Sequence, residues 1–147
     1  MAEIHKIAKL NINGMSAGDK MSMLNEFLYK QEIDIMLLQE VTHTDFEAVR
    51  GYTVHFNIGT SKRGTAIVTR EQIQITNVTR LPSGRGIAAN YQGVWIVNIY
   101  APSGTANRQE REEFFNMELA YLLRELPPNI ILGGDFNCVV AGGLYGP

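Results

Sequence analysis

Residues 130–137 read Ile130-Ile131-Leu132-Gly133-Gly134-Asp135-Phe136-Asn137, and the rest of the chain is organised around this stretch. The three aliphatic residues indicate a short buried strand, and the two glycines let the backbone turn sharply. Asp135 and Asn137 lie two positions apart at the mouth of that strand, so both side chains point the same way. The pair suits phosphodiester chemistry, because the Asp can take a proton from water while the Asn binds a phosphate oxygen. The alternative is an Asx turn that closes a core strand.

Composition predicts a globular domain that does not bind nucleic acid by bulk charge. The chain has 147 residues, of which 45% are hydrophobic and 19% charged, and its formal net charge is -2. Any affinity for nucleic acid must therefore come from a local patch. The single cysteine, Cys138, excludes an internal disulfide framework and a cysteine-based zinc site. With no apolar run that suits a signal peptide or a membrane span, we expect an intracellular, unanchored protein.

The first part of the chain has the pattern of a strand, a helix and a second strand. Residues Ile4 to Asn13 alternate in polarity, Ser16 to Gln31 has apolar residues at helical spacing, and Ile33 to Glu40 is mostly apolar. We expect Ser16 or Asp19 to cap the helix. Such a unit makes the two strands parallel, so Asn11 and Glu40 would lie at neighbouring strand mouths.

The middle of the chain is rich in predicted antiparallel strands. They cover residues 52–57, 64–69, 73–81, 87–91 and 94–100. Gln92-Gly93 is expected to form a tight hairpin between the last two strands. Asn107 and Glu110 are expected to cap a second helix, which Pro127-Pro128 ends. Its apolar stripe contains Phe115, Leu119, Leu122 and Leu126.

Polar residues follow the ends of four of these apolar strands: Asn11 and Asn13, Glu40, Tyr100, then Asp135 and Asn137. Polar groups gathered at the same ends of strands indicate a site in the crevice of an open sheet. Each has a structural alternative, namely a turn-forming Asn, a surface Glu or an edge aromatic with a wet hydroxyl. Four arginines near loops could grip a DNA backbone or simply be solvated: Arg63, Arg70, Arg80 and Arg85.

Four motifs occur in order: Leu10-Asn11-Ile12-Asn13-Gly14, Leu38-Gln39-Glu40, Asn98-Ile99-Tyr100-Ala101-Pro102 and Gly133-Gly134-Asp135-Phe136-Asn137. With them the chain resembles the endonuclease/exonuclease/phosphatase superfamily. It most resembles the apurinic-endonuclease-like domain of LINE-type (non-LTR) retrotransposons, where LNING and GGDFN are common wording. The resemblance implies a four-layer α/β sandwich of the DNase I-like kind, here an N-terminal part with an incomplete second sheet. One domain would cover residues 1–147.

The resemblance also implies an activity, a cofactor and residue roles. The activity is a metal-dependent phosphodiesterase that nicks DNA in the nucleus, with Mg2+, or Mn2+ as an alternative, held by Glu40 and Asn11. Asp135 would orient or deprotonate the attacking water, and Asn137 would support that Asp or the phosphate. Tyr100 would donate to a phosphate oxygen, and Asn11 would help to hold the phosphate or the carboxylate.

The chain departs from the family in one respect. Family members finish with a later Asp-carrying stretch and a terminal Ser-Asp-His motif, whereas the three histidines here, His5, His43 and His55, all precede Asp135. Loss of such a charge-stabilising pair costs on the order of 10^2 to 10^3 in rate. The resemblance therefore implies a truncated copy with impaired activity, whose uncovered strand edges predict poor solubility or dependence on a missing C-terminal portion or reverse transcriptase region.

Two other functions stay open from the sequence. One is a catalytically inactive remnant that acts as a nucleic-acid- or protein-binding module, which the missing Asp-His pair favours. The other is a phosphatase on small or lipid phosphates, against which the LNING and GGDFN wording argues. The sequence also contains no amphipathic basic helix that would suit a membrane surface.

Overall fold

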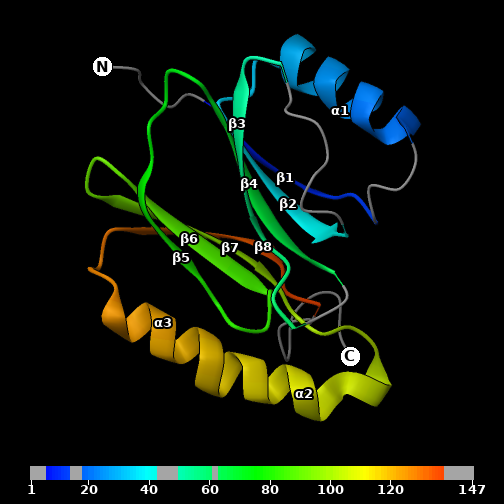
Figure 1. Ribbon diagram of the computed structural model, residues 1–147. Coiled ribbons are helices and arrows are strands. Elements are labelled where there is room, and N and C mark those ends of the chain that lie inside the picture. The colour runs from blue at the N-terminus through cyan, green and yellow to red at the C-terminus, as the bar shows by residue number, and fades with distance from the viewer. Residues whose placement is uncertain (1–5, 14–17, 43–49, 61–62, 138–147) are drawn as a thin grey trace, which may run out of the picture.

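The computed structural model describes residues 6–13, 18–42, 50–60 and 63–137, and it forms two four-stranded mixed sheets. Sheet A has the spatial order β1 (Ile7–Asn11), β2 (Ile35–Val41), β4 (Gly64–Arg70) and β3 (Tyr52–Asn57). Sheet B has the order β5 (Thr76–Arg80), β6 (Gly86–Tyr91), β7 (Val94–Tyr100) and β8 (Ile130–Asp135). The sheets lie face to face, and helices cover both outer sides (Figure 1). The expected four-layer α/β sandwich is confirmed.

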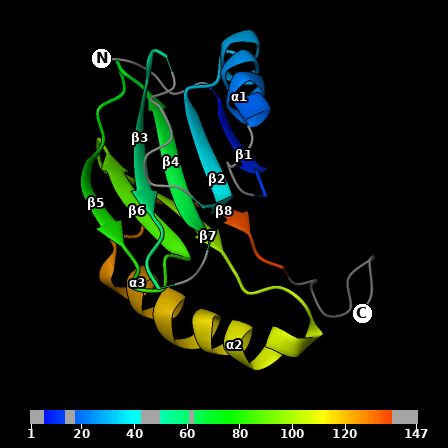
Figure 2. The same cartoon turned by 45° about the vertical axis from the view of Figure 1, so that its right-hand side comes forward.

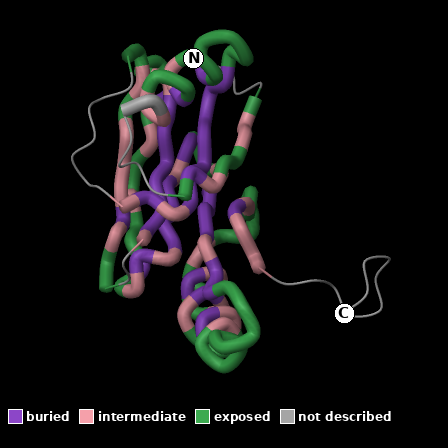
Figure 3. Tube along the Cα trace, turned by 90° about the vertical axis from the view of Figure 1, so that its right-hand side faces the viewer, coloured by how far each residue is buried: buried purple, intermediate pink, exposed green. Residues whose placement is uncertain are grey.

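Helix α1 (Gly18–Lys30) covers sheet A. Sheet B is covered by one long helical segment: η1 (Thr105–Asn107), α2 (Arg108–Glu113), the π turn η2 (Phe114–Leu119) and α3 (Ala120–Glu125). Three buried apolar clusters fill the spaces between the four layers, and the buried stretches run along the strands while the outer helix faces are exposed (Figure 3). Strand β2 lies between α1 and sheet B, which explains why six of its seven residues are buried.

Both sheets end on the same side in a parallel edge strand. Strand β1 pairs with β2 in parallel, with Asn11 opposite Gln39, and β8 pairs with β7 in parallel, with Asp135 opposite Tyr100. Figure 2 shows the two edge strands β1 and β8 on one side of the sandwich. Their carboxyl ends therefore meet those of β2 and β7 in one place. The expectation that residues 130–132 form a buried strand that turns at its glycines is wrong, because β8 is an edge strand. Ile131 and Leu132 are 41% and 38% exposed along this open edge, and Gly133 and Gly134 lie within β8.

Most expected elements are confirmed with small shifts of their ends. The Gln92-Gly93 hairpin is present, and both residues have the positive φ angles, 51° and 89°, that such a tight turn requires. The expected strand over residues 73–81 begins only at Thr76. Ser16 lies outside the described residues, and Asp19 is inside α1 rather than at its cap. No helix in the described part of the chain is long and apolar enough to cross a membrane.

The expected capping pair of the second helix is wrong. The side chain of Asn107 makes no capping hydrogen bond. Its Nδ2 atom donates to the backbone oxygen of Ser103, 2.8 Å away, and a 3-10 turn leads into the helix. The π turn also widens the apolar stripe, so that Phe114 is buried and Phe115 packs against the same cluster. Leu126 leaves the helix in an extended conformation, as the residue before a proline usually does.

Candidate active site

The carboxyl ends of β1, β2 and β8 bring two carboxylates onto one amide nitrogen. Asn11 Nδ2 donates to Glu40 Oε2 and also to Asp135 Oδ2, which lies 3.2 Å away. These three residues come from both sheets and are 124 positions apart at the extremes. The convergence that the sequence predicted for Asn11, Glu40 and Asp135 is therefore present, while their catalytic roles stay predictions.

The orientation of the Asn11 amide follows from its other contact. Its Oδ1 atom accepts a hydrogen bond of 3.0 Å from the backbone N–H of Asn13, and a backbone N–H can only donate. The atom that faces Glu40 and Asp135 must then be the nitrogen. Asn11 thus donates to both carboxyl groups, and its amide oxygen already accepts from the backbone of the same chain.

A bulge in β2 aims Glu40 at the site. Gln39 pairs with Thr65 and Val41 with Gly64, so Glu40 is an extra residue in the ladder, and its φ angle is +61°. In a regular strand Glu40 would share the face of Leu38, which packs beneath α1. The bulge gives that face to Val41 instead and turns Glu40 out at the strand end. Such left-handed backbone in a non-glycine residue is strained, and strain of this kind gathers at functional sites.

Asp135 is held from the other side by the end of its own strand. Its Oδ1 atom accepts a hydrogen bond of 3.2 Å from the backbone N–H of Asn137, and Asn137 Nδ2 donates to the backbone oxygen of Ala101 at 2.7 Å. Phe136 stacks on Phe115 of η2, with ring centroids 6.2 Å apart and planes within 9°. Helix and neighbouring strand therefore fix the position of the Asp135 carboxylate. Asn137 acts on Asp135 through its backbone.

Tyr100 ends β7 beside Asp135 and carries a hydroxyl that stays protonated. Burial raises the pKa of Tyr100 above its ordinary value of 10.0, and the nearby negative charge of Glu40 raises it further, against the opposing charges of Arg85 and Arg63. The Arg85 guanidinium lies 5.1 Å from the centre of the Tyr100 ring. A neutral hydroxyl at this place is a hydrogen-bond donor, as a group that binds a phosphate oxygen must be.

A buried amide pair that the sequence analysis missed joins the two sheets beneath the site. Gln39 Nε2 donates to Asn98 Oδ1 at 2.9 Å, and Asn98 Nδ2 donates to the backbone oxygens of Leu38 and Ala66 at 2.9 and 2.8 Å. Both side chains are fully buried. Gln39 directly precedes Glu40, and Asn98 lies two residues before Tyr100 on the same face of β7. An amide in the middle of the apolar run Val94 to Ile99 was the available signal.

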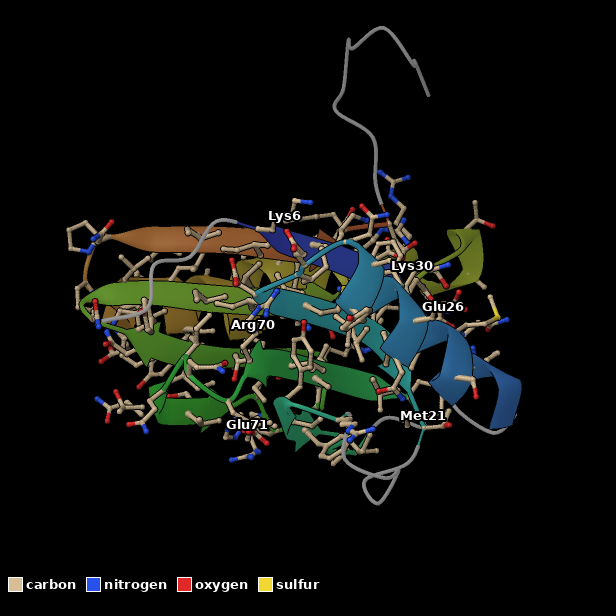
Figure 4. All side chains as sticks on the ribbon, turned by 90° about the horizontal axis from the view of Figure 1, so that it is seen from above. Lys6, Met21, Glu26, Lys30, Arg70 and Glu71 are labelled. Carbon is tan, nitrogen blue, oxygen red and sulfur yellow. The ribbon has the colours of Figure 1, made fainter. Side chains whose placement is uncertain are left out.

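Two of the four arginines contact the site and two do not. Arg63 forms an ion pair with Glu40, and its Nη1 atom lies 2.5 Å from Asn13 Oδ1. Arg85 packs on Tyr100 as described. Arg70 pairs with Asp34 at the beginning of β2, at the opposite end of sheet A, near Lys6 (Figure 4). Arg80 donates to the backbone oxygen of Phe56.

Three of the other reactive side chains lie outside the described residues, and one lies on a strand. Cys138, His5 and His43 belong to the first group. His55 lies on β3 and donates to none of the site residues named above. The carboxylates and amides at the strand ends therefore supply the chemistry of the described site.

The donor set fits a hydrated divalent cation. Glu40 and Asp135 present hard carboxylate oxygens around one point, the kind that Mg2+ prefers, and Mg2+ keeps several waters, so that one or two protein ligands suffice. Among the described residues, no group of three or more His, Cys, Asp and Glu side chains lies close enough to form a fuller cage. Any cation here would be held mostly by water and by Glu40.

The family model of the endonuclease/exonuclease/phosphatase family matches residues 10–145. The chain belongs to this family. The match includes all four strand ends that carry the site. Nucleases of this family typically depend on a divalent metal ion, which agrees with the oxygen donors described above. The two face-to-face sheets with helices outside are the DNase I-like fold of this family, as expected.

The chain is similar to one curated protein and to two solved structures. The exodeoxyribonuclease of Bacillus subtilis (strain 168) is 25% identical over an alignment of 146 residues, and the match covers 90% of this chain and 58% of the relative. A variant of the 3' phosphatase NExo from Neisseria, solved with a product DNA hairpin, matches with a TM-score of 0.75 and 24% identity over 92% of this chain and 59% of that one. An AP endonuclease from Archaeoglobus fulgidus matches with a TM-score of 0.70 and 21% identity, over 89% and 56%.

The chain spans less than three fifths of the length of these proteins. The two structural matches are below 25% identity and show the fold. The expected membership of the superfamily is confirmed. The retrotransposon origin, which the motif wording implies, and the truncation, which the missing Ser-Asp-His motif implies, stay predictions.

Proposed function

We propose that this chain is the part of a divalent-metal-dependent DNA phosphodiesterase that carries its metal-binding carboxylate and its water-activating aspartate. The observation that carries the proposal is the convergence of Glu40 and Asp135 on the Nδ2 atom of Asn11. Two carboxylates held beside each other by one amide can serve a cation and a water molecule side by side. Membership of the endonuclease/exonuclease/phosphatase family supports the reaction class.

In the proposed reaction the residues of this chain position water and phosphate. Asp135, fixed by Asn11 and by the Asn137 backbone, accepts a proton from the water that attacks phosphorus. The bond from phosphorus to the 3' oxygen breaks, the phosphate stays on the 5' end, and the leaving 3' oxygen takes a proton from solvent water to become a 3'-hydroxyl. The Tyr100 hydroxyl donates to a non-bridging phosphate oxygen. A cation bound at Glu40 supplies positive charge for the phosphate when it is present.

We further propose that the cut is an internal nick, as in target-site cleavage by LINE-type retrotransposons, with Mg2+ as the cation. The support for this finer proposal is the wording of the two motifs around Asn11 and Asp135, LNING and GGDFN. The names of the similar proteins do not decide where in the DNA the cut is made, since they include an exodeoxyribonuclease, a 3' phosphatase and an AP endonuclease. The liberated 3'-hydroxyl would prime DNA synthesis.

The test is a comparison of three DNA substrates with Mg2+: supercoiled plasmid, a duplex with a recessed 3' end, and a duplex that ends in a 3'-phosphate. Nicking predicts open circles from the plasmid before any shortening of the duplex. Glu40→Gln and Asp135→Asn should each lower the rate by at least about 10^2. Glu26→Gln is the matched control, because Glu26 pairs with Lys30 on the exposed side of α1 (Figure 4). Folded protein that cleaves none of the three substrates would contradict the proposal.

A further inference from the structure

Arg63 lies where the positive charge of a bound cation would be. Its guanidinium contacts Glu40 Oε1, while Asn11 occupies the other carboxylate oxygen, Oε2. Both oxygens of Glu40 are thus engaged by nitrogen donors. A divalent cation needs direct contact with a carboxylate oxygen, and a guanidinium at the same oxygen repels it. Arg63 and the cation therefore compete for Glu40.

The surroundings of Arg63 allow it to move. Its side chain is 40% exposed, whereas that of Glu40 is 18% exposed. Arg63 directly precedes β4, and it also contacts Asn13 Oδ1, beyond the end of β1. An arginine at the rim can leave Glu40 by rotating its long side chain, with no change in the strands. Glu40 is fixed in place by the bulge and by Asn11.

We propose that Arg63 is an exchange residue: it neutralises Glu40 while no cation is bound, and it transfers to a DNA phosphate when a divalent cation takes Glu40. This inference rests on the proposed function. A guanidinium binds phosphate oxygens in the same forked geometry as carboxylate oxygens, so one group can serve both partners in turn. The exchange also supplies the local positive charge that a chain of net charge -2 needs beside its site.

The exchange makes two opposite predictions for one substitution. In Arg63→Met without DNA, Glu40 has lost its competitor, so the Kd for Mn2+ should fall by about three- to tenfold, the value of a partly exposed ion pair. With Mn2+ present, the same variant has lost one phosphate contact, so DNA binding should weaken and its dependence on log[salt] should fall by about one. A residue that only stabilises the fold would not produce this reversal.

The experiment uses Mn2+ binding measured by electron paramagnetic resonance and anisotropy of a labelled phosphorothioate duplex, which resists hydrolysis. Arg124→Met is the matched control, because Arg124 is exposed in the last turn of α3 and, within the described part of the chain, donates only to the helix backbone oxygen of Ala120. It should leave the Mn2+ affinity unchanged. In EDTA, Arg63→Met should leave the salt dependence of DNA binding unchanged, because Arg63 is then held by Glu40.

A double-mutant cycle keeps the proposal falsifiable. In the Glu40→Gln background, Arg63→Met should no longer raise Mn2+ affinity, since the shared carboxylate is gone. An Mn2+ affinity that is unchanged or lower in Arg63→Met, in protein with wild-type circular dichroism, would overturn the exchange. If the wild type nicks DNA and binds Mn2+ through Glu40 but shows no exchange, only this inference fails. If the wild type neither binds Mn2+ nor cleaves DNA, the proposed function itself fails.

Discussion

Gln39 Nε2 and Asn98 Oδ1 lie 2.9 Å apart and join the two sheets by a buried hydrogen bond. Asn98 also satisfies the backbone oxygens of Leu38 and Ala66 in the opposite sheet. Because both side chains are fully buried, the loss of one partner leaves the others unpaired in the interior. The amide pair holds the strands that end in Glu40 and in Tyr100 at a fixed separation, so it couples the fold to the geometry of the site.

We expect Asn98→Leu to lower the free energy of unfolding by about 2–4 kcal/mol, although leucine has a similar volume, because buried donors and acceptors lose their partners. Urea denaturation measures this change. Asn129→Leu places the same substitution at an exposed position and should change the stability by less than about 1 kcal/mol. Equal effects of the two substitutions would show that the amide pair contributes no more than a surface residue.

Gly134 is required where β8 approaches β7. A Cβ atom at Gly134 would lie 2.1 Å from the backbone oxygen of Ile99, and its φ angle of +129° disfavours any side chain. At Gly133 the nearest atom to an added Cβ is the flexible end of Leu37, at 2.9 Å. We expect Gly134→Ala to destabilise the protein by at least about 3 kcal/mol and Gly133→Ala by clearly less, as measured by urea denaturation. Similar losses at both positions would contradict this account of the two glycines.

The strand ends of the site could be predicted from the sequence, and the direction of one side chain could not. Alternation along β1 places Asn11 on the face opposite Ala8 and Leu10, and the structure has it toward sheet B. The same rule places Glu40 beneath α1, yet the bulge reverses it. The bulge depends on the partner strand β4, where Val41 pairs with Gly64. Only glycine fits there, because a Cβ added at Gly64 would lie 2.0 Å from the Asn57 backbone oxygen. The alternation of polar and apolar residues within β2 alone therefore does not predict the bulge.

Tertiary contacts also decided which polar groups joined the site. Arg63 and Arg70 look alike in the sequence, because each lies at an end of the same strand. Only the topology places one beside Glu40 and the other beside Asp34. Asn107 stands where the sequence predicts a helix cap, but its side chain donates to the backbone oxygen of Ser103. Local propensity was outweighed wherever a group had a competing partner from elsewhere in the chain.

His55 should make stability depend on pH. Burial lowers the pKa of His55 below its ordinary value of 6.5, and Arg80 lowers it further. Below pH 6.5 His55 is therefore protonated in the unfolded chain but still neutral in the folded chain. Its contribution to the free energy of unfolding is complete above pH 6.5 and is lost as the pH falls toward the folded pKa. We expect the difference in unfolding free energy between wild type and His55→Gln to be larger at pH 8 than at pH 5. A difference that is constant or grows toward pH 5 would rule out this effect.

The open edge of sheet B should limit solubility. Leu132 is 38% exposed on β8, which pairs only with β7 among the described strands. An exposed apolar edge strand can pair with other chains, and a lysine on it blocks such pairing. We expect Leu132→Lys to raise the concentration at which dynamic light scattering first detects aggregates. Tyr121→Lys, at a 63% exposed position on α3, adds the same charge away from the edge and should have a smaller effect.

The Tyr100 hydroxyl should contribute to cleavage as a donor over a wide range of pH. Tyr100→Phe keeps the ring that Arg85 packs on and removes only the hydroxyl, so we expect wild-type stability and a rate of DNA nicking lower by about 10- to 100-fold. Burial and Glu40 raise the pKa of Tyr100 above 10.0, so the hydroxyl is still protonated at pH 9. The ratio of the wild-type rate to the Tyr100→Phe rate should then stay constant from pH 7 to pH 9. A ratio that falls toward one within this range would mean that the hydroxyl ionises there, and that burial and Glu40 do not protect its proton.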